Sequence, residues 1–170
     1  MALKKKTIRG QFFSFFRRKS KKDPKKNQHT QKKMFGIFNA IINDEFERVK
    51  RIVKENPEIV HIKDDYFPKT LLDVAIAHGK LEIAKFLFEM GGRPNLDIYC
   101  DGHDTSVHMA AYNGRIETLK WVFKEKVLLL DVMEIKGEWK RTPLDCAIAS
   151  GRLETANYLW EKRRATQPQR

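Results

Sequence analysis

Cysteine is scarce in this chain of 170 residues, and long apolar runs are missing. Two cysteines, Cys100 and Cys146, cannot build a disulfide framework, which favours a reducing compartment. No apolar run approaches the ~20 residues that a membrane-crossing helix needs. Gly91 and Gly92 stand alone, so there is no glycine-rich phosphate loop. These absences argue against a disulfide-rich secreted domain, a membrane-spanning protein and a nucleotide-binding site.

Acidic residues are almost missing from the first 33 positions. That segment holds thirteen Lys or Arg and one acid, Asp23, whereas residues 34–170 hold the other 21 basic and 21 acidic residues. Such a break in composition is expected where a tail meets a folded domain. We expect a disordered basic tail over residues 1–33, a folded domain over 34–162 and a polar extension over 163–170.

The folded part is repetitive. Three segments align: "TLLDVAIAHGKLEIAKFLF" from Thr70, "TSVHMAAYNGRIETLKWVF" from Thr105 and "TPLDCAIASGRLETANYLW" from Thr142. A fourth unit upstream, "AIINDEFERVKRIV" from Ala40, keeps the apolar positions but lacks the threonine. Successive units are 35, 35 and 37 residues apart.

Each repeated position has a physical role. Apolar residues at helical spacing on both sides of a glycine predict two short amphipathic helices. The threonine can cap the first helix, a small alanine allows close packing, and the glycine can end the helix in a left-handed conformation. One such helix pair cannot bury its apolar face, so stacked pairs are expected to form an elongated solenoid.

These segments resemble ankyrin repeats, whose pattern runs T-P-L-H-x-A-x-x-x-G-x-x-E. The best match is "TPLDCAIASGRLE" at residues 142–154, and the histidine of the pattern is kept as His108, with Asp73 and Asp145 in its place elsewhere. The resemblance covers about residues 34–162. It implies an all-α solenoid with finger loops that binds one or more proteins, and that is neither an enzyme nor a cofactor carrier. We expect a monomer.

The two ends and one finger depart from this pattern. The second helix of the upstream unit is rich in charge, as a solvent-facing cap would be. The finger "KEKVLLLDVMEIKGEWKR" lacks a glycine after its second helix, which predicts an irregular loop. The last unit runs into "EKRRATQPQR", a segment polar enough to close the stack.

One cluster suggests chemistry. Cys100, His103 and His108, near Asp104, could hold zinc, but a structural zinc site needs four well-placed ligands. The favoured interpretation is that His108 is the structural histidine of its repeat. Ser106 has no visible oxyanion donors or orienting group around it, so a nucleophile there is disfavoured. Likewise, Cys146 is interpreted as a buried, inert thiol. We therefore expect no metal and no catalytic residue.

The resemblance also implies where a protein partner binds: at the finger tips and on the exposed face of each first helix. Exposed aromatic residues beside arginine favour binding hot spots. The predicted protein-binding residues are Tyr66, Phe67, Lys69, His78, Tyr112, Asn113, Trp139 and Arg141. Alternatively, Phe67 and Trp139 cover the bases of their loops. Because Asp65, Asp101 and Asp104 lie among the cations, nucleic acid is not an expected partner of the repeats.

The tail combines aromatic and basic residues. Its predicted binding residues are Lys4, Lys5, Lys6, Phe12, Phe13, Phe15, Phe16, Arg17, Arg18, Lys19, Lys21 and Lys22. This pattern resembles basic-aromatic segments that bind anionic membranes or calmodulin, and phosphorylation at Ser14 or Ser20 would weaken membrane attachment. The alternatives are an import signal read by an import receptor, contact with nucleic acid, a transit peptide, or a purely solubilising role. We expect a cytoplasmic protein, with membrane or nuclear localisation set by this tail.

Overall fold

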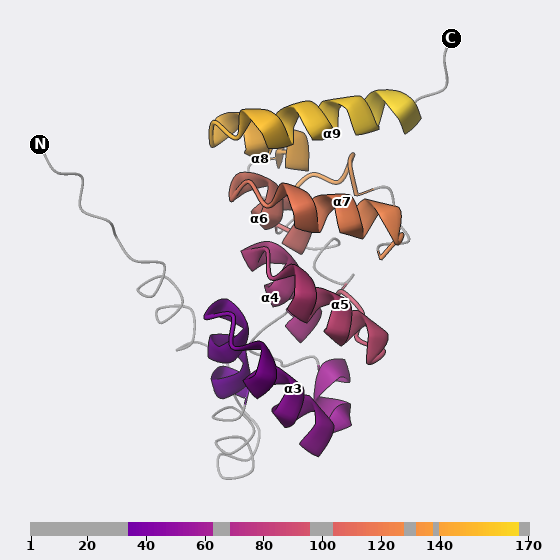
Figure 1. Cartoon of the computed structure of the whole chain (residues 1–170). Helices are drawn as coiled ribbons and strands as arrows, with labels where there is room; N and C mark the ends of the chain where they lie inside the picture. The colour runs from indigo at the N-terminus through magenta and orange to yellow at the C-terminus, as the bar shows by residue number, and fades with distance from the viewer. Residues whose placement is uncertain (1–33, 63–68, 96–103, 128–131, 138–139, 167–170) are drawn as a thin grey trace, which may run out of the picture.

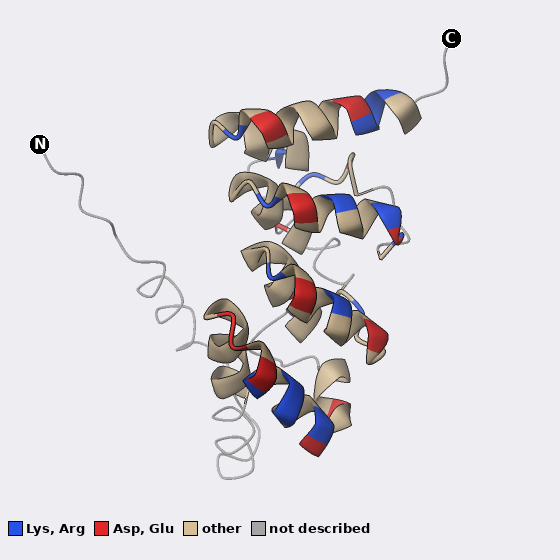
Figure 2. Cartoon of the chain, in the orientation of Figure 1, with Lys and Arg blue, Asp and Glu red and all other residues tan. Residues whose placement is uncertain are grey.

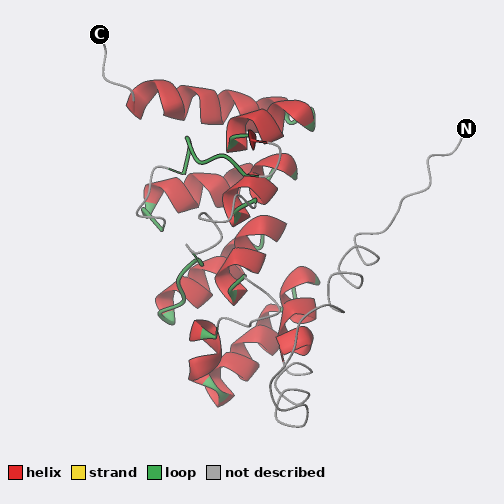
Figure 3. Cartoon of the chain, turned by 180° about the vertical axis from the view of Figure 1, so that it is seen from behind, coloured by secondary structure: helices red, strands yellow, loops and turns green. Residues whose placement is uncertain are grey.

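The protein is a stack of helix pairs. The computed structural model describes residues 34–62, 69–95, 104–127, 132–137 and 140–166, and these residues form helices and connecting turns without strands (Figure 1, Figure 3). The helices are residues 34–42, α3 (Phe46–Glu55), η1 (Pro57–His61), α4 (Leu71–His78), α5 (Leu81–Glu89), α6 (Ser106–Tyr112), α7 (Ile116–Lys124), α8 (Pro143–Ala149) and α9 (Leu153–Thr166). The predicted all-α solenoid is confirmed. Among the described residues, no helix is long and apolar enough to span a bilayer.

The first helices of units two to four all begin with the same pair of hydrogen bonds. In α4, Thr70 Oγ1 accepts from the Asp73 amide at 3.2 Å, and Asp73 Oδ2 accepts from the Thr70 amide at 3.0 Å. Equivalent capping boxes join Thr105 to His108 and Thr142 to Asp145. Each cap satisfies amides that a helix N-terminus leaves without partners, which is worth about 1 kcal/mol. The predicted capping role of the threonines is confirmed.

The first helices end in a left-handed turn. Gly79, Gly114 and Gly151 have φ angles of 72°, 69° and 69°. The upstream unit makes the same turn at Asp44, where φ is 66°. Aspartate enters this region more readily than most residues, and so the first unit keeps the hairpin without a glycine. The turns predicted at the three glycines are confirmed.

Stacking buries one continuous core. Ala75, Ala110 and Ala147 are fully buried, and so are Leu87 and Leu119 on the second helices. Aromatic rings then cross from each second helix to the next: Phe46 to Phe86 at 5.8 Å between ring centroids, Phe88 to Trp121 at 5.8 Å and Phe123 to Tyr158 at 6.3 Å. Each helix pair is therefore covered by its neighbours.

The N-terminal end of the stack is closed by charge. Arg51 lies on α3 at the position that Phe86, Trp121 and Tyr158 occupy in later units, and it is exposed. Glu47 and Arg48 are exposed as well. The predicted solvent-facing cap agrees with this arrangement.

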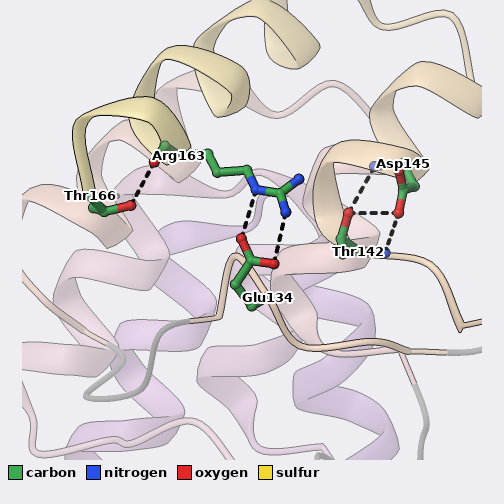
Figure 4. A network of polar contacts seen from close by, with 5 residues as sticks. All are labelled: Glu134, Thr142, Asp145, Arg163 and Thr166. Carbon is green, nitrogen blue, oxygen red and sulfur yellow. Dashed lines mark hydrogen bonds and ion pairs between the residues drawn. The ribbon is translucent and has the colours of Figure 1, made fainter. Parts of the chain in front are cut away.

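The C-terminal end differs from expectation. Ile148, Leu153 and Trp160 are 61%, 75% and 51% exposed, so the expectation that a polar segment closes the stack is wrong. The polar residues after Trp160 continue α9 along its own axis to Thr166, past the expected domain end at 162, and they do not fold over its face. Arg163 holds this extension to the preceding finger: its Nη2 donates to Glu134 Oε2 at 3.0 Å, and its Nε lies 2.7 Å from Oε1 (Figure 4).

The turn after α7 forms without the glycine that follows α5. In the preceding unit, Gly91 follows α5 with a φ of 87°, and its place after α7 is taken by Lys126 with a φ of 48°. The following amide bonds back to the helix in both units: Gly92 to Leu87 O at 2.8 Å and Val127 to Val122 O at 3.1 Å. The third unit therefore forms the same helix-ending turn with a residue that is strained in it.

We predict that Lys126→Gly stabilises the protein. A lysine in the left-handed region costs about 1–2 kcal/mol. Glycine removes this cost but loses more backbone entropy on folding. We therefore expect the free energy of unfolding, measured in urea, to rise by about 0.5–1 kcal/mol. Glu125→Gly is the control, because Glu125 has a φ of −82° and needs no glycine. Equal effects of the two substitutions would contradict the assignment of strain to Lys126.

Candidate protein-interaction surface

Asp73 ties three segments together inside the stack. Its Oδ2 accepts from the Asn95 amide at 2.8 Å in addition to the bond from Thr70, and its Oδ1 accepts from Ser106 Oγ of the next unit at 2.9 Å. Burial raises the pKa of Asp73, although these donors favour its ionised form. The equivalent Asp145 lies in the last unit and is exposed, and there the Thr142 amide lowers the pKa (Figure 4).

His108 has the same role in the third unit. Its Nδ1 lies 3.3 Å from the Thr105 amide, which must donate, so Nε2 carries the proton and donates to the carbonyls of Ile135 and Arg141, both at 3.0 Å. The interpretation of His108 as a structural histidine is confirmed. Because both ring nitrogens are used, the ring cannot bind a metal without breaking the capping box or the finger.

The other residues of the suspected cluster cannot be placed beside His108. Cys100 and His103 lie outside the described residues. Within the ranges that the structure does describe, no three His, Cys, Asp or Glu side chains are grouped as metal ligands. Cys146 is 5% exposed, and burial raises the pKa of its thiol to about 11, as expected for an unreactive cysteine.

A row of basic residues marks the hairpin turns. Lys80, Arg115 and Arg152 each follow the glycine of a hairpin turn. These turns lie one beyond another along one edge of the stack (Figure 2). The turn of the first unit carries acidic residues at this place. Tyr112 and Asn113 at the end of α6 and His78 at the end of α4 belong to the same edge. We call this surface the turn ridge: His78, Lys80, Tyr112, Asn113, Arg115 and Arg152.

The basic side chains of the turn ridge lie across the preceding turn. A Cβ added at Gly79 would lie 2.5 Å from Arg115 Cδ, and one at Gly114 would lie 2.9 Å from Arg152 Cδ. These glycines are therefore needed for the close approach of the next unit as well as for their φ angles. Lys80 reaches back in the same way, and its Nζ lies 3.2 Å from Asp44 Oδ2.

The turn ridge is electropositive at neutral pH. Burial lowers the pKa of His78, and Lys69, Arg115 and Lys80 lower it further, so the imidazole is neutral. Asp44 offsets Lys80. In the part of the chain that the structure describes, neither Arg115 nor Arg152 forms an ion pair, although Arg152 Nε donates to the Tyr112 carbonyl at 3.3 Å.

Tyr112 is the aromatic residue of this surface. It is 50% exposed and ends α6 just before the turn that carries Arg115, and its backbone carbonyl accepts from Arg152. Asn113 next to it donates from Nδ2 to the Ala77 carbonyl at 3.4 Å, which joins the α6 turn to the preceding unit. A half-exposed aromatic ring on a ridge that also carries arginines has the composition of a protein-binding hot spot.

The outer face of the stack contrasts with the turn ridge. Its charges pair within each second helix: Glu82 with Lys85 and Glu117 with Lys120, both at 2.8 Å, and Glu47 with Lys50 at 3.9 Å. Red and blue positions repeat side by side down α3, α5 and α7 (Figure 2). Pairs of this kind are worth about 0.2–0.5 kcal/mol and leave a neutral, hydrated surface.

The predicted interaction residues fall into two groups. The structure describes Lys69, His78, Tyr112, Asn113 and Arg141. Tyr112 and Arg141 are exposed, and the other three are partly buried. Tyr66, Phe67, Trp139 and all predicted tail residues lie outside the described residues. Lys80, Arg115 and Arg152 were not among the residues predicted from the sequence. The recurring Gly-Lys or Gly-Arg pair in units two to four was the signal for them.

Comparison with known proteins identifies the family. The model of ankyrin repeats in three copies matches residues 35–131, so the chain belongs to the ankyrin-repeat family. A chain from the crystal structure of the yeast ribosomal protein Rps3 in complex with its chaperone Yar1 has a similar fold. The TM-score is 0.64 at 20% identity, over 82% of this chain and 98% of that one. No curated protein matches this sequence.

We predict that His108 makes stability depend on pH. Burial lowers its pKa from the ordinary 6.5, so the unfolded chain binds this proton first, and stability is lost as the pH falls below about 6.5. His108→Asn should lower stability at pH 7.5 by about 1–3 kcal/mol, with a smaller deficit near pH 5. Urea unfolding across this range measures both, and His78→Asn, measured in parallel, separates the contribution of the other histidine. A constant deficit would contradict the prediction.

Proposed function

We propose that this protein is a non-enzymatic ankyrin-repeat adaptor that binds a protein segment along the turn ridge. The observation that carries the proposal is the half-exposed Tyr112 on the same ridge as Arg115 and Arg152. A ring of this kind supplies apolar contact, and the two guanidinium groups suit carboxylates. The bound segment is therefore expected to carry acidic residues beside an apolar anchor.

Three further observations support this surface over the others. The outer face neutralises itself by ion pairs, and so it offers little net charge to a partner. The turn ridge is held rigid by contacts of Arg115 and Arg152 with the preceding unit, which lowers the entropy that binding would cost. In the Rps3–Yar1 structure a chaperone binds a ribosomal protein. This agrees with protein binding as a function of the fold.

The tail is proposed to be a membrane-attachment arm. Support comes from the sequence: four phenylalanines in residues 12–16 lie between "KKK" and "RRKSKK". Each cation near an anionic leaflet contributes about 1 kcal/mol, and inserted phenylalanine adds apolar burial. Phosphorylation of Ser14 or Ser20 would place negative charge among these cations and release the arm.

A nuclear role is the second candidate. The two basic clusters in "RRKSKKDPKKNQHTQKK" resemble an import signal, and such a tail would also contact phosphates without sequence preference. Import and phosphate contact need only the charges, whereas membrane insertion also needs the aromatic residues. The phenylalanines therefore favour the membrane arm.

We predict that Tyr112→Ala and Arg115→Glu each reduce binding to the partner. The partner is first identified by affinity capture with the full chain, and its affinity is then measured by titration. Removing a hot spot should weaken binding by about 2 kcal/mol, or about thirtyfold. Tyr112→Ala should change thermal stability little, because Tyr112 is half exposed. Lys120→Glu on the outer face is the matched control and should bind normally. Unchanged affinity in both ridge variants would contradict the proposed surface.

We predict that the full chain binds vesicles containing an anionic lipid and does not bind neutral ones. Replacing the four phenylalanines by alanine should reduce binding at constant charge, as measured by vesicle sedimentation. Glutamate at both Ser14 and Ser20 should also reduce it. If the alanine variant bound as well as the natural chain, attachment would be purely electrostatic and the nuclear alternative would be favoured.

A further inference from the structure

The C-terminal end of the stack carries an apolar surface made of Ile148, Leu153 and Trp160, which we call the end face. Ile148 is 61% exposed, whereas Ile76 and Ala111, at the same position of the two preceding units, are fully buried. The next helix pair covers both of those residues. The end face is thus a stacking surface of the same kind as those inside the protein.

The second helices lead to the same conclusion. Phe88 and Phe123 each contact a ring of the next unit, and Trp160 occupies the equivalent position on α9. Among the described helices, none lies beyond α9 in the stack (Figure 1). Leu153 takes the place of Phe46, which contacts Phe86 of the second unit, and it is 75% exposed. Leu153 and Trp160 are thus apolar side chains at positions where other units contact a neighbour, but here they are exposed to solvent.

Up to Thr166, the last described residue, the chain does not turn back to cover this surface where the other units do. α5 and α7 are nine residues long, and a left-handed turn at Gly91 or Lys126 follows each. α9 continues for 14 residues instead, and Arg163 fastens it to Glu134. α9 therefore continues straight through the position at which a further unit would begin.

We infer that the end face pairs with the end face of a second copy of this chain. Leu153 and Trp160 are seven residues apart, which is two helical turns on one side of α9. Two α9 helices that cross antiparallel about a twofold axis would place each Trp160 on the Leu153 of the other copy, with Ile148 at the edge. The contact between Trp160 and Leu153 then forms twice, once on each side of the twofold axis, as a symmetric dimer requires.

Charge at the other end of the stack favours this arrangement over a head-to-tail one. A second copy that offered its N-terminal end would bring Arg48 and Arg51 against Leu153 and Trp160, at the cost of desolvating two guanidinium groups. Three apolar side chains per copy make a smaller core than a standard interface has. The dimer is therefore weak, with a dissociation constant on the order of 10–100 µM. It would replace the monomer expected from the sequence.

Sedimentation velocity of the full chain over a range of concentrations tests the inference. The natural chain should shift from monomer to dimer as concentration rises, whereas Trp160→Glu and Leu153→Glu should stay monomeric. Both side chains are exposed, so neither substitution should lower the thermal stability of the monomer appreciably. Lys85→Glu on the outer face is the control and should dimerise normally. A natural chain that remains monomeric throughout, or a dimer that survives Trp160→Glu, would overturn the inference.

Thiol cross-linking tests the antiparallel geometry. Asn157 lies near the midpoint between Leu153 and Trp160 and is exposed, so Asn157→Cys should cross-link to itself across the twofold axis through a short bis-maleimide. Lys85→Cys, two units away at the equivalent position, should not. Both variants carry Cys100→Ser, and Cys146 is buried. Equal cross-linking of the two variants would exclude this geometry. A dimer that is lost on deletion of residues 1–33 would assign the contact to the tail and also overturn the inference.

Discussion

Each inner helix pair of this stack has two apolar faces, and its neighbours on both sides cover them. The constraint explains why alanine is fully buried at the same position of three first helices and why aromatic rings cross from each second helix to the next. It also explains the polar network at Asp73 and His108. These side chains join a helix start to its finger, and Asp73 also joins it to the next unit, so their hydrogen bonds form only when the stack does.

The same constraint separates the surfaces by chemistry. The outer face pairs its own charges, the N-terminal end carries arginine where other units carry aromatic rings, and the turn ridge collects the basic side chains that cross each turn. The end face combines the apolar chemistry of a stacking surface with exposure to solvent. A partner protein and a second copy of the chain would thus use different surfaces, and neither contact excludes the other.

Much of the fold could be predicted from local signals, because threonine caps, turn glycines and buried alanines act through the residues next to them. The unpredicted features depend on contacts between units. Arg115 became part of a surface only because its side chain lies over Gly79 of another unit. The polarity of residues 161–166 suggested a cap, but the direction of α9 carries them past Trp160. The left-handed turn at Lys126 could not be predicted, because the sequence has no glycine at this position.

Hydrogen exchange of a variant with a central cavity tests the stacking account most directly. Leu119 is fully buried on α7, and Leu119→Ala should cost about 2–5 kcal/mol. If units are stable only through their neighbours, α4 and α8 should lose protection together with α6 and α7, as in a chain of coupled repeats. Loss confined to α6 and α7, with unchanged protection in α4 and α8, would contradict the account.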